Sequence, residues 1–420
     1  MVWFEPRWIV RGLAQENRYA LATDRCFLSR HVSDYMSRQT NQEQPVSASL
    51  AVWAVILTMF GAGLSGCAAI DRQYEAALLL SELAAEEDGA LARRTPSPHR
   101  QEISYEIDGE HYIADLYRPG EGSEARAAFV LTHGFTAYGK DDPRLVAFAE
   151  GLARARFNVL VPDVPSLREL QVHPSDRRFI AAAVLFLHEH AELVPEGRIG
   201  VGAFSYAVGP MILAAMEPAV ARQLDFTVAI GGYYDVEDAI RFLTTGYHDL
   251  GPERVWAQPQ QVAKWSFLGS YLYRIEHPQD RALLEEMVRR RQHDPDADID
   301  SLAAELEAEG RTIYNLLTNR DPDQVSVLLA ALPEDIQAEI SALDLANERL
   351  DRFQPALLLI HGSDDPIIPA THSRALAAEV REGELYVVGG LNHVDIDLRL
   401  RDRWRLWRAT VALLRLRDGV

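Results

Sequence analysis

The chain has 420 residues, enough for two or three average domains or for one large α/β domain with an insertion. Hydrophobic residues make up 48% of it and charged residues 25%, a composition that excludes a disordered, collagen-like or coiled-coil protein. The formal net charge is −20 and the sequence shows no basic stripe, so nothing indicates a nucleic-acid partner. Both cysteines, Cys26 and Cys67, precede the main body, which therefore has no disulfide framework and no cysteine-based metal site.

An apolar run near the N-terminus predicts a leader segment over residues 1–66. The run extends from Leu50 to Leu64 without a charge, and its fifteen residues suit the core of a signal peptide better than a membrane span, which needs about 20. Signal peptides normally begin a few residues before this core, so Met36 is a candidate for the true start of translation.

The residues that follow the apolar run, Leu-Ser-Gly-Cys at positions 64–67, resemble the lipobox of bacterial lipoproteins. The resemblance implies that the chain is cut before Cys67 and that this cysteine carries the lipid; an uncleaved anchor is the alternative. Ala68 in the next position then implies the outer membrane of a bacterial cell envelope, with the protein facing the periplasm. We expect residues 67–99, which contain a helical stretch at 74–92 and end in a Pro-containing breaker, to form a tether.

The next segment predicts a β-hairpin and then a mostly parallel sheet. Two alternating runs, 103–107 and 112–117, flank the turn pair Asp108-Gly109. Short apolar runs then alternate with helical periods, which is typical of buried parallel strands with helices on both faces of the sheet. These runs are 128–131, 159–161, 199–201, 226–230, 356–360 and 385–388.

A helical insertion interrupts this rhythm. Residues 244–352 contain helix-like stretches at 281–291, 299–309 and 333–350 and no convincing buried strand. We therefore predict a core made of residues 100–243 and 353–420, with residues 244–352 as a cap that covers the strand ends.

A serine follows one of the predicted strands, where a nucleophile would be exposed. Strand 199–201 leads through Gly-Ala-Phe to Ser205, and a helix begins soon after it. At this point the chain resembles the α/β-hydrolase family, whose nucleophile lies in a G-x-S-x-G turn between a strand and a helix. Ala203 and Ala207 stand where the family has glycine; both are small, as the crossing of strand and helix requires.

Two downstream loops resemble those that complete the family's triad. Strand 356–360 ends in a G-x-x-D loop that assigns the acid to Asp365, leaving its neighbour Asp364 to solvent or to a local turn. Strand 385–388 is followed by a short loop with His393, so that serine, acid and histidine come in the family's order. Asp235 is a less well placed alternative for the acid. His393 would take the proton of Ser205, and Asp365 would hold the imidazole in the useful tautomer.

The family's oxyanion loop resembles His133-Gly134-Phe135, after strand 128–131. The resemblance implies that the backbone N–H groups of Phe135 and Tyr206 bind the oxyanion. His133, and likewise His361, are expected to be buried structural histidines.

The resemblance as a whole implies an α/β-hydrolase fold and a hydrolase that cleaves a carboxylic ester through an acyl-enzyme, with no metal and no cofactor. The expected partners are a small-molecule ester and, through the lipid anchor, a membrane; the sequence does not indicate an oligomeric state. A peptidase or an acyltransferase on the same triad is an alternative. A second one is an envelope scaffold that has lost catalysis, because Ala203 and Ala207 depart from the family's pattern.

Overall fold

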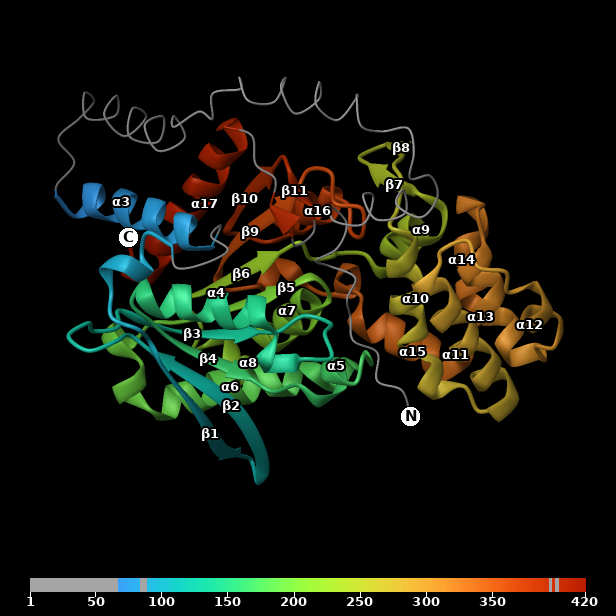
Figure 1. Ribbon diagram of the computed structural model, residues 1–420, viewed down its shortest axis with the longest axis horizontal. Helices are drawn as coiled ribbons and strands as arrows, with labels where there is room; N and C mark the ends of the chain where they lie inside the picture. The colour runs from blue at the N-terminus through green and yellow to red at the C-terminus, as the bar shows by residue number, and fades with distance from the viewer. Residues whose placement is uncertain (1–66, 84–88, 393–394, 397–399) are drawn as a thin grey trace, which may run out of the picture. The chain divides into compact units, whose positions relative to one another are not determined.

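The computed structural model describes residues 67–83, 89–392, 395–396 and 400–420 (Figure 1). The apolar run, lipobox residues 64–66 and the candidate His393 lie outside the described residues. None of the helices within the described ranges is long and apolar enough to span a membrane.

An eight-stranded sheet forms the centre of the domain, with the strand order β1-β2-β4-β3-β5-β6-β9-β10. Strands β1 and β2 pair in antiparallel fashion with each other, β2 pairs in the same way with β4, and the other pairings are parallel. The mostly parallel sheet that the apolar runs predict is confirmed. The strands are β1 His99–Ile107, β2 Glu110–Arg118, β3 Ala127–Thr132, β4 Phe157–Pro162, β5 Ile199–Phe204, β6 Phe226–Ile230, β9 Ala356–Gly362 and β10 Gly383–Val388.

Helices cover both faces of this sheet, because successive strand residues point to opposite sides. On β9, Leu357 and Leu359 join one hydrophobic cluster, whereas Leu358 and Ile360 join the other. The first cluster contains α6 (Arg177–Glu189), α7 (Val208–Met216) and α16 (Ala370–Glu379). The second contains α3 (Cys67–Leu83), α4 (Pro143–Arg154) and α17 (Leu400–Asp418).

The first part of the expected tether, helix α3, packs on the domain instead of linking it loosely to the leader. Helix α3 begins at Cys67 and packs on the domain, with Ala76 and Leu79 fully buried against the helices of the second cluster. The Nε1 of Trp407 on α17 donates to the carbonyl of Gln73 over 3.1 Å. The reason is the i, i+3 spacing of Ala76 and Leu79, which gives α3 an apolar side to bury.

The chain between β6 and β9 forms the helical insertion. Its elements are α9 Val236–Thr245, β7 Tyr247–Leu250, β8 Glu253–Trp256, α10 Gln261–Gly269, α11 Pro278–His293, α12 Asp300–Ala304, α13 Ala308–Thr318, α14 Val325–Ala330 and α15 Glu334–Leu343. The hairpin of β7 and β8 was not predicted, because these strands are short, polar and largely exposed. The expected helix 299–309 is divided into α12 and α13, and the expected helix 333–350 ends at Leu343.

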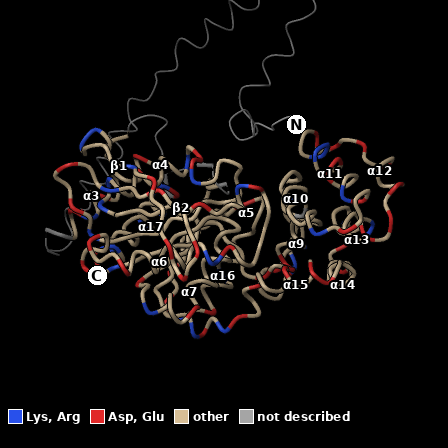
Figure 2. Tube along the Cα trace, turned by 90° about the horizontal axis from the view of Figure 1, so that it is seen from below, with Lys and Arg blue, Asp and Glu red and all other residues tan. Residues whose placement is uncertain are grey.

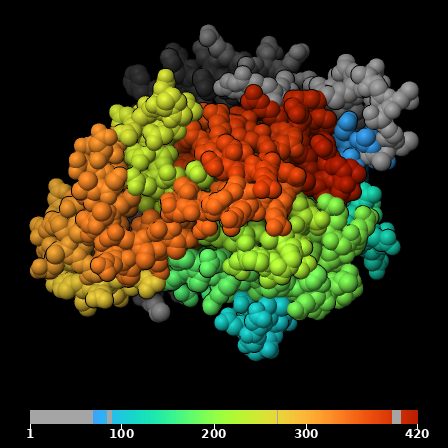
Figure 3. Space-filling view, turned by 180° about the vertical axis from the view of Figure 1, so that it is seen from behind, coloured from blue at the N-terminus to red at the C-terminus, as the bar shows by residue number. Residues whose placement is uncertain are grey.

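Three contacts place the insertion beside loops that leave the carboxyl ends of strands. The Tyr273 hydroxyl donates to the carbonyl of Val172, which follows β4, over 3.2 Å. The hydroxyl of Tyr233, which follows β6, donates to the carbonyl of Leu343 over 3.0 Å. The Gln260 N–H donates over 2.8 Å to the carbonyl of Pro366, which follows β9. In Figure 3 the insertion, in yellow-green and orange, accordingly lies against the orange-red segment that contains β9 and α16.

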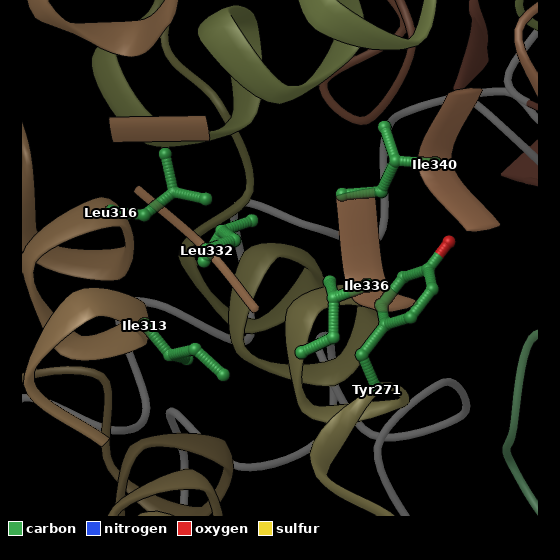
Figure 4. Close-up of a pocket in the computed structure, with 6 residues that line it drawn as sticks. All are labelled: Tyr271, Ile313, Leu316, Leu332, Ile336 and Ile340. Carbon is green, nitrogen blue, oxygen red and sulfur yellow. The ribbon is translucent and has the colours of Figure 1, made fainter. Parts of the chain in front are cut away.

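The insertion has its own apolar packing between α13 and α15. Five aliphatic side chains and the ring of Tyr271 surround a small pocket with a cavity volume of about 10 Å³ (Figure 4). The lining residues are Tyr271, Ile313, Leu316, Leu332, Ile336 and Ile340. Because its lining is almost entirely carbon, we interpret this pocket as part of the insertion's hydrophobic core.

Candidate active site

The candidate residues leave the sheet from one edge, because the parallel strands end nearly level. Thr132 at the end of β3 pairs with Ala203 on β5, and Phe204 at the end of β5 pairs with Ile230 on β6. Likewise, β9 and β10 end together, at the pair of Gly362 and Val388. Sites on open parallel sheets lie at such carboxyl ends.

Ser205 lies in the turn between β5 and α7, in a strained backbone conformation. β5 ends at Phe204, and Ser205 has a φ of 53°, in the left-handed region that residues other than glycine rarely adopt. Such a conformation costs about 1–3 kcal/mol and persists only where the surrounding structure imposes it. A strained strand-to-helix turn of this kind is the feature that exposes the nucleophile of a G-x-S-x-G motif.

Ala203 and Ala207 fit this turn because the neighbouring side chains come closest to the backbone at other positions. Ala203 and Ala207 are fully buried, and both keep their methyl groups within the packed core. A Cβ on Gly209 would instead lie 1.8 Å from the Tyr233 hydroxyl oxygen, and one on Gly202 would lie 2.5 Å from the Phe129 ring. Glycine is therefore required at 202 and 209, while alanine is accommodated at 203 and 207.

His133 holds the candidate oxyanion loop beside this turn. Its Nδ1 lies 2.9 Å from the Gly134 carbonyl, and its Nε2 lies 3.1 Å from the Val164 N–H. A carbonyl only accepts and an N–H only donates, so Nδ1 carries the proton and Nε2 accepts. Burial lowers the pKa of this histidine, which keeps it neutral. The ring thus has a structural arrangement, as expected.

The fixed carbonyl of Gly134 also orients the next N–H group. The C=O and N–H of one planar trans peptide point in opposite directions, so the N–H of Phe135 points away from the side held by His133. The loop lies close to the turn that holds Ser205, since a Cβ on Gly134 would be 4.0 Å from the Phe204 carbonyl oxygen. His133 therefore restricts the direction of one candidate oxyanion donor.

Tyr206 provides the second candidate N–H donor, and a buried carboxylate holds its side chain in place. Its hydroxyl lies 3.2 Å from Asp176 Oδ2 and 3.3 Å from the His173 carbonyl. Asp176 is 2% exposed and also accepts from the Ser166 hydroxyl and, over 3.1 Å, from the His173 N–H. Burial raises the pKa of Asp176, which these donors offset only in part. The sequence offered no signal for this anchor beyond a polar turn.

The same polar network reaches into the insertion. The hydroxyl of Tyr273 lies 2.9 Å from His173 Nδ1 and 2.9 Å from Glu339 Oε2 on α15. Glu339 also accepts from Arg274 and is nearly buried. The insertion is thereby connected through His173 and Asp176 to the residue next to Ser205.

Asp365 is buried in its loop, whereas its neighbour faces outward. Oδ1 of Asp365 accepts the N–H groups of Ile367 at 2.8 Å and Ile368 at 3.0 Å, which fixes the plane of the carboxylate. Asp364 is exposed and accepts from the Ser363 hydroxyl over 2.9 Å. This arrangement agrees with the register that the G-x-x-D spacing predicts.

His361, close to Asp365, is structural in the same sense as His133. It is fully buried, its Nε2 donates to the Ile368 carbonyl over 2.8 Å, and its Nδ1 accepts from the Ser373 hydroxyl over 2.7 Å. Nε2 lies 3.5 Å from Asp365 Oδ2. Both ring nitrogens thus have protein partners, which leaves His361 poorly suited to move a substrate proton.

The loop that leads to His393 passes directly over the end of β9. A Cβ on Gly362 would lie 1.7 Å from the carbonyl oxygen of Leu391, so only glycine fits there. The Ser363 N–H donates to the Val388 carbonyl over 2.9 Å. The chain two residues before His393 is therefore in contact with the end of β9, which leads to Asp365, although His393 lies outside the described residues.

The alternative acid, Asp235, has a different task in the structure. It is the N-cap of α9, and its Oδ1 accepts the Asp238 N–H over 2.8 Å. His372 on α16, which the sequence analysis did not single out, accepts the neighbouring Tyr234 N–H over 3.3 Å. Burial and the nearby histidines lower the pKa of His372 to about 3. We therefore infer that Asp235 and His372 stabilise the turn after β6.

Comparison with known proteins identifies the fold. No protein-family model matches the sequence, and no curated protein matches it. The structure is similar to the rice cell wall degrading esterase LipA from Xanthomonas oryzae, at 14% identity and a TM-score of 0.51, over 80% of this chain and 93% of that one. It is also similar to a protein from Legionella pneumophila described as a hydrolase, at 12% identity and a TM-score of 0.51, over 82% and 95% of the two chains. The chain therefore has the α/β-hydrolase fold.

Proposed function

We propose that the protein is a serine hydrolase that cleaves a carboxylic ester through an acyl-enzyme on Ser205. The observation that carries this proposal is the positive φ of Ser205 at the end of β5, because a folded protein has little other reason to hold a serine in a strained turn at a strand end. The level ends of the strands and the buried carboxylate of Asp365 support it.

In the proposed reaction, His393 takes the proton of Ser205 Oγ while that oxygen attacks the ester carbonyl carbon. The oxyanion accepts hydrogen bonds from the N–H groups of Phe135 and Tyr206. When the tetrahedral intermediate collapses, the bond to the alcohol oxygen breaks and the alcohol leaves with the proton from His393. A water molecule then attacks the acyl-enzyme in the same way, releasing the carboxylic acid and regenerating Ser205.

The supporting groups have separate roles in this mechanism. We assign Asp365 to orient His393 and stabilise its imidazolium form. His133 directs the Phe135 N–H, and Asp176 holds the side chain of Tyr206. One oxyanion donor is typically worth about 3 kcal/mol in the transition state, so misdirecting either donor would slow acylation by about a hundredfold.

The experiment combines a fluorophosphonate label with p-nitrophenyl esters of increasing chain length. We expect the label on Ser205 alone, turnover of at least one ester, and loss of both in Ser205→Ala. Ser97→Ala, which changes an exposed serine, is the matched control and should behave as the parent. Persistent labelling of Ser205→Ala would refute the assignment of the nucleophile.

The same panel separates the other functions open to this triad. Labelling without ester turnover would favour a peptidase or an acyltransferase, which is tested with amide substrates and with added acyl acceptors. The absence of both labelling and turnover would favour a non-catalytic envelope scaffold. The burial of Ala203 and Ala207 within the packed turn supports the hydrolase over the scaffold.

We further propose that Cys67 is lipidated and anchors the protein to the bacterial envelope, facing the periplasm. Because α3, described from Cys67 onward, packs on the domain through Ala76 and Leu79, the lipid would join a segment held on the domain rather than a long tether, which holds the domain close to the membrane surface. Cys67→Ser should block processing and release the protein from the membrane fraction. Unchanged processing and fractionation would contradict the anchor.

A further inference from the structure

A buried lysine in the insertion has no counter-ion among the described residues. Lys264 on α10 is 6% exposed, and its ammonium group has no hydrogen bond or ion pair within the part of the chain that the structure describes. Lys140 is the other lysine of the sequence. It lies 3.1 Å from Asp115 and 2.9 Å from Glu102. Buried charges in proteins are normally paired in the manner of Lys140, so Lys264 requires an explanation.

Arg291, in the last turn of α11, faces the same segment of α10. Its guanidinium lies over the ring of Trp265, 5.9 Å from the ring centre, and Gln292 Nε2 donates to Ser266 Oγ over 3.0 Å. These two contacts hold the C-terminal end of α11 against residues 264–266 of α10.

One donor on the Arg291 guanidinium has no hydrogen-bond partner among the described residues. Nη1 donates to the Pro295 carbonyl, whereas Nε is buried and has no hydrogen-bond partner among the described residues. Nε and Nη2 form an edge of the guanidinium that binds a carboxylate or phosphate through two parallel hydrogen bonds. This edge thus has the geometry for an oxyanion.

The third cation is Arg320, which follows the C-terminal end of α13. Burial, together with the charges of Arg320 and Arg291, lowers the pKa of Lys264 to about 8. The groups that act on Lys264 are therefore cationic, in a protein whose net charge is −20. Figure 2 shows Lys and Arg, in blue, along the insertion near α11 and α13. None of the three cations forms an ion pair with a described carboxylate, and like charges near one another repel unless an anion lies between them.

We propose that Lys264, Arg291 and Arg320 form a binding site for a carboxylate or phosphate group. The Gln260 N–H contacts the Pro366 carbonyl, next to Asp365, and Lys264 lies one helical turn further along α10. The anion is therefore either a free one or an acidic group of the substrate; the second source rests on the proposed function, whereas the first does not.

Binding of a free anion is tested first, by calorimetric titration of the full chain with inorganic phosphate and with succinate at constant ionic strength. Sodium chloride at the same ionic strength controls for screening. We expect saturable binding, weakened at least about tenfold in Lys264→Met and in the exposed variant Arg320→Gln, since each removes one charge-assisted contact. Arg289→Gln, which removes an exposed charge paired with Glu286 on α11, should bind as the parent does.

The two sources are separated by kinetics on paired esters that differ only in a terminal carboxylate or its methyl ester. If the anion belongs to the substrate, the parent prefers the charged ester, and Lys264→Met loses this preference through KM while retaining activity on the neutral one. If the anion is free, phosphate and succinate bind and the pair is hydrolysed equally. Two results would overturn the site. One is that neither anion binds and the parent shows no preference for the charged ester. The other is that binding and preference are both unchanged in Lys264→Met. Absence of all esterase activity with intact anion binding would refute the proposed function alone.

Discussion

Replacing Asp365 with asparagine should separate its role in catalysis from its role in folding. Oδ1 of Asp365 accepts two backbone N–H groups, from Ile367 and Ile368. An asparagine retains an oxygen at this position, so both hydrogen bonds are kept, and only Oδ2 is replaced by an NH₂ group. That group donates where an orienting carboxylate must accept.

The expected loss is therefore large in activity and small in stability. Removing the acid that fixes the histidine tautomer lowers turnover by about 10⁴, or about 5 kcal/mol, in serine hydrolases with this triad. Asp365→Asn should show this loss in kcat with an unfolding free energy within about 1 kcal/mol of the parent. Asp365→Ala should lose stability as well, by about 2 kcal/mol or more, because the two N–H groups are left without their acceptor.

Asp364→Asn is the matched control, since the two side chains are adjacent but only Asp365 is buried. We expect it to stay within several-fold of the parent in kcat, because the exposed carboxylate contacts only the Ser363 hydroxyl among the described residues. Steady-state kinetics on a p-nitrophenyl ester and urea unfolding measure the two quantities. Equal losses in both variants, or a larger loss in Asp364→Asn, would refute the proposed register of this loop.

Three further outcomes follow from the structure. Ser205→Gly should be more stable than Ser205→Ala by about 1 kcal/mol in urea unfolding, because glycine adopts a φ of 53° without strain; equal stabilities would argue against a strained turn. Tyr206→Phe should lose about 1–3 kcal/mol, since buried Asp176 loses a hydroxyl donor, while the exposed Tyr138→Phe stays within about 0.5 kcal/mol; matching effects would show that the anchor is weak. The pKa of Lys264 is lowered to about 8, so the folded state binds fewer protons than the unfolded state above that pH. The unfolding free energy of the parent should therefore rise by about 3 kcal/mol relative to that of Lys264→Met between pH 8 and 10.5. A stability difference that does not change over this range would show that Lys264 is not desolvated.

The sequence by itself determined the layers of the fold and the place of Ser205 at the end of a strand. Buried strands such as β3, with all six positions buried, read as continuous apolar runs because both faces of the sheet are covered. The turn pair Asp108-Gly109 specified the first hairpin, since both residues have positive φ in the two-residue turn. Local patterns of this kind follow from backbone geometry within a few residues. The place of Ser205 directly after a strand is likewise a local feature that the sequence shows.

Only the tertiary structure decided which polar side chains support the site. Asp176 and Tyr206 are 30 residues apart, and His173 and Tyr273 are 100 apart, so no periodicity connects them. The packing of α3 on α17 likewise joins residues separated by more than 300 positions. Lys264 lies in an unremarkable helical stretch of the sequence, and its burial beside Arg291 becomes visible only when α10 and α11 are packed together. Contacts between distant segments depend on the complete fold, because each partner is defined by the position of the other and not by its own neighbours in the chain.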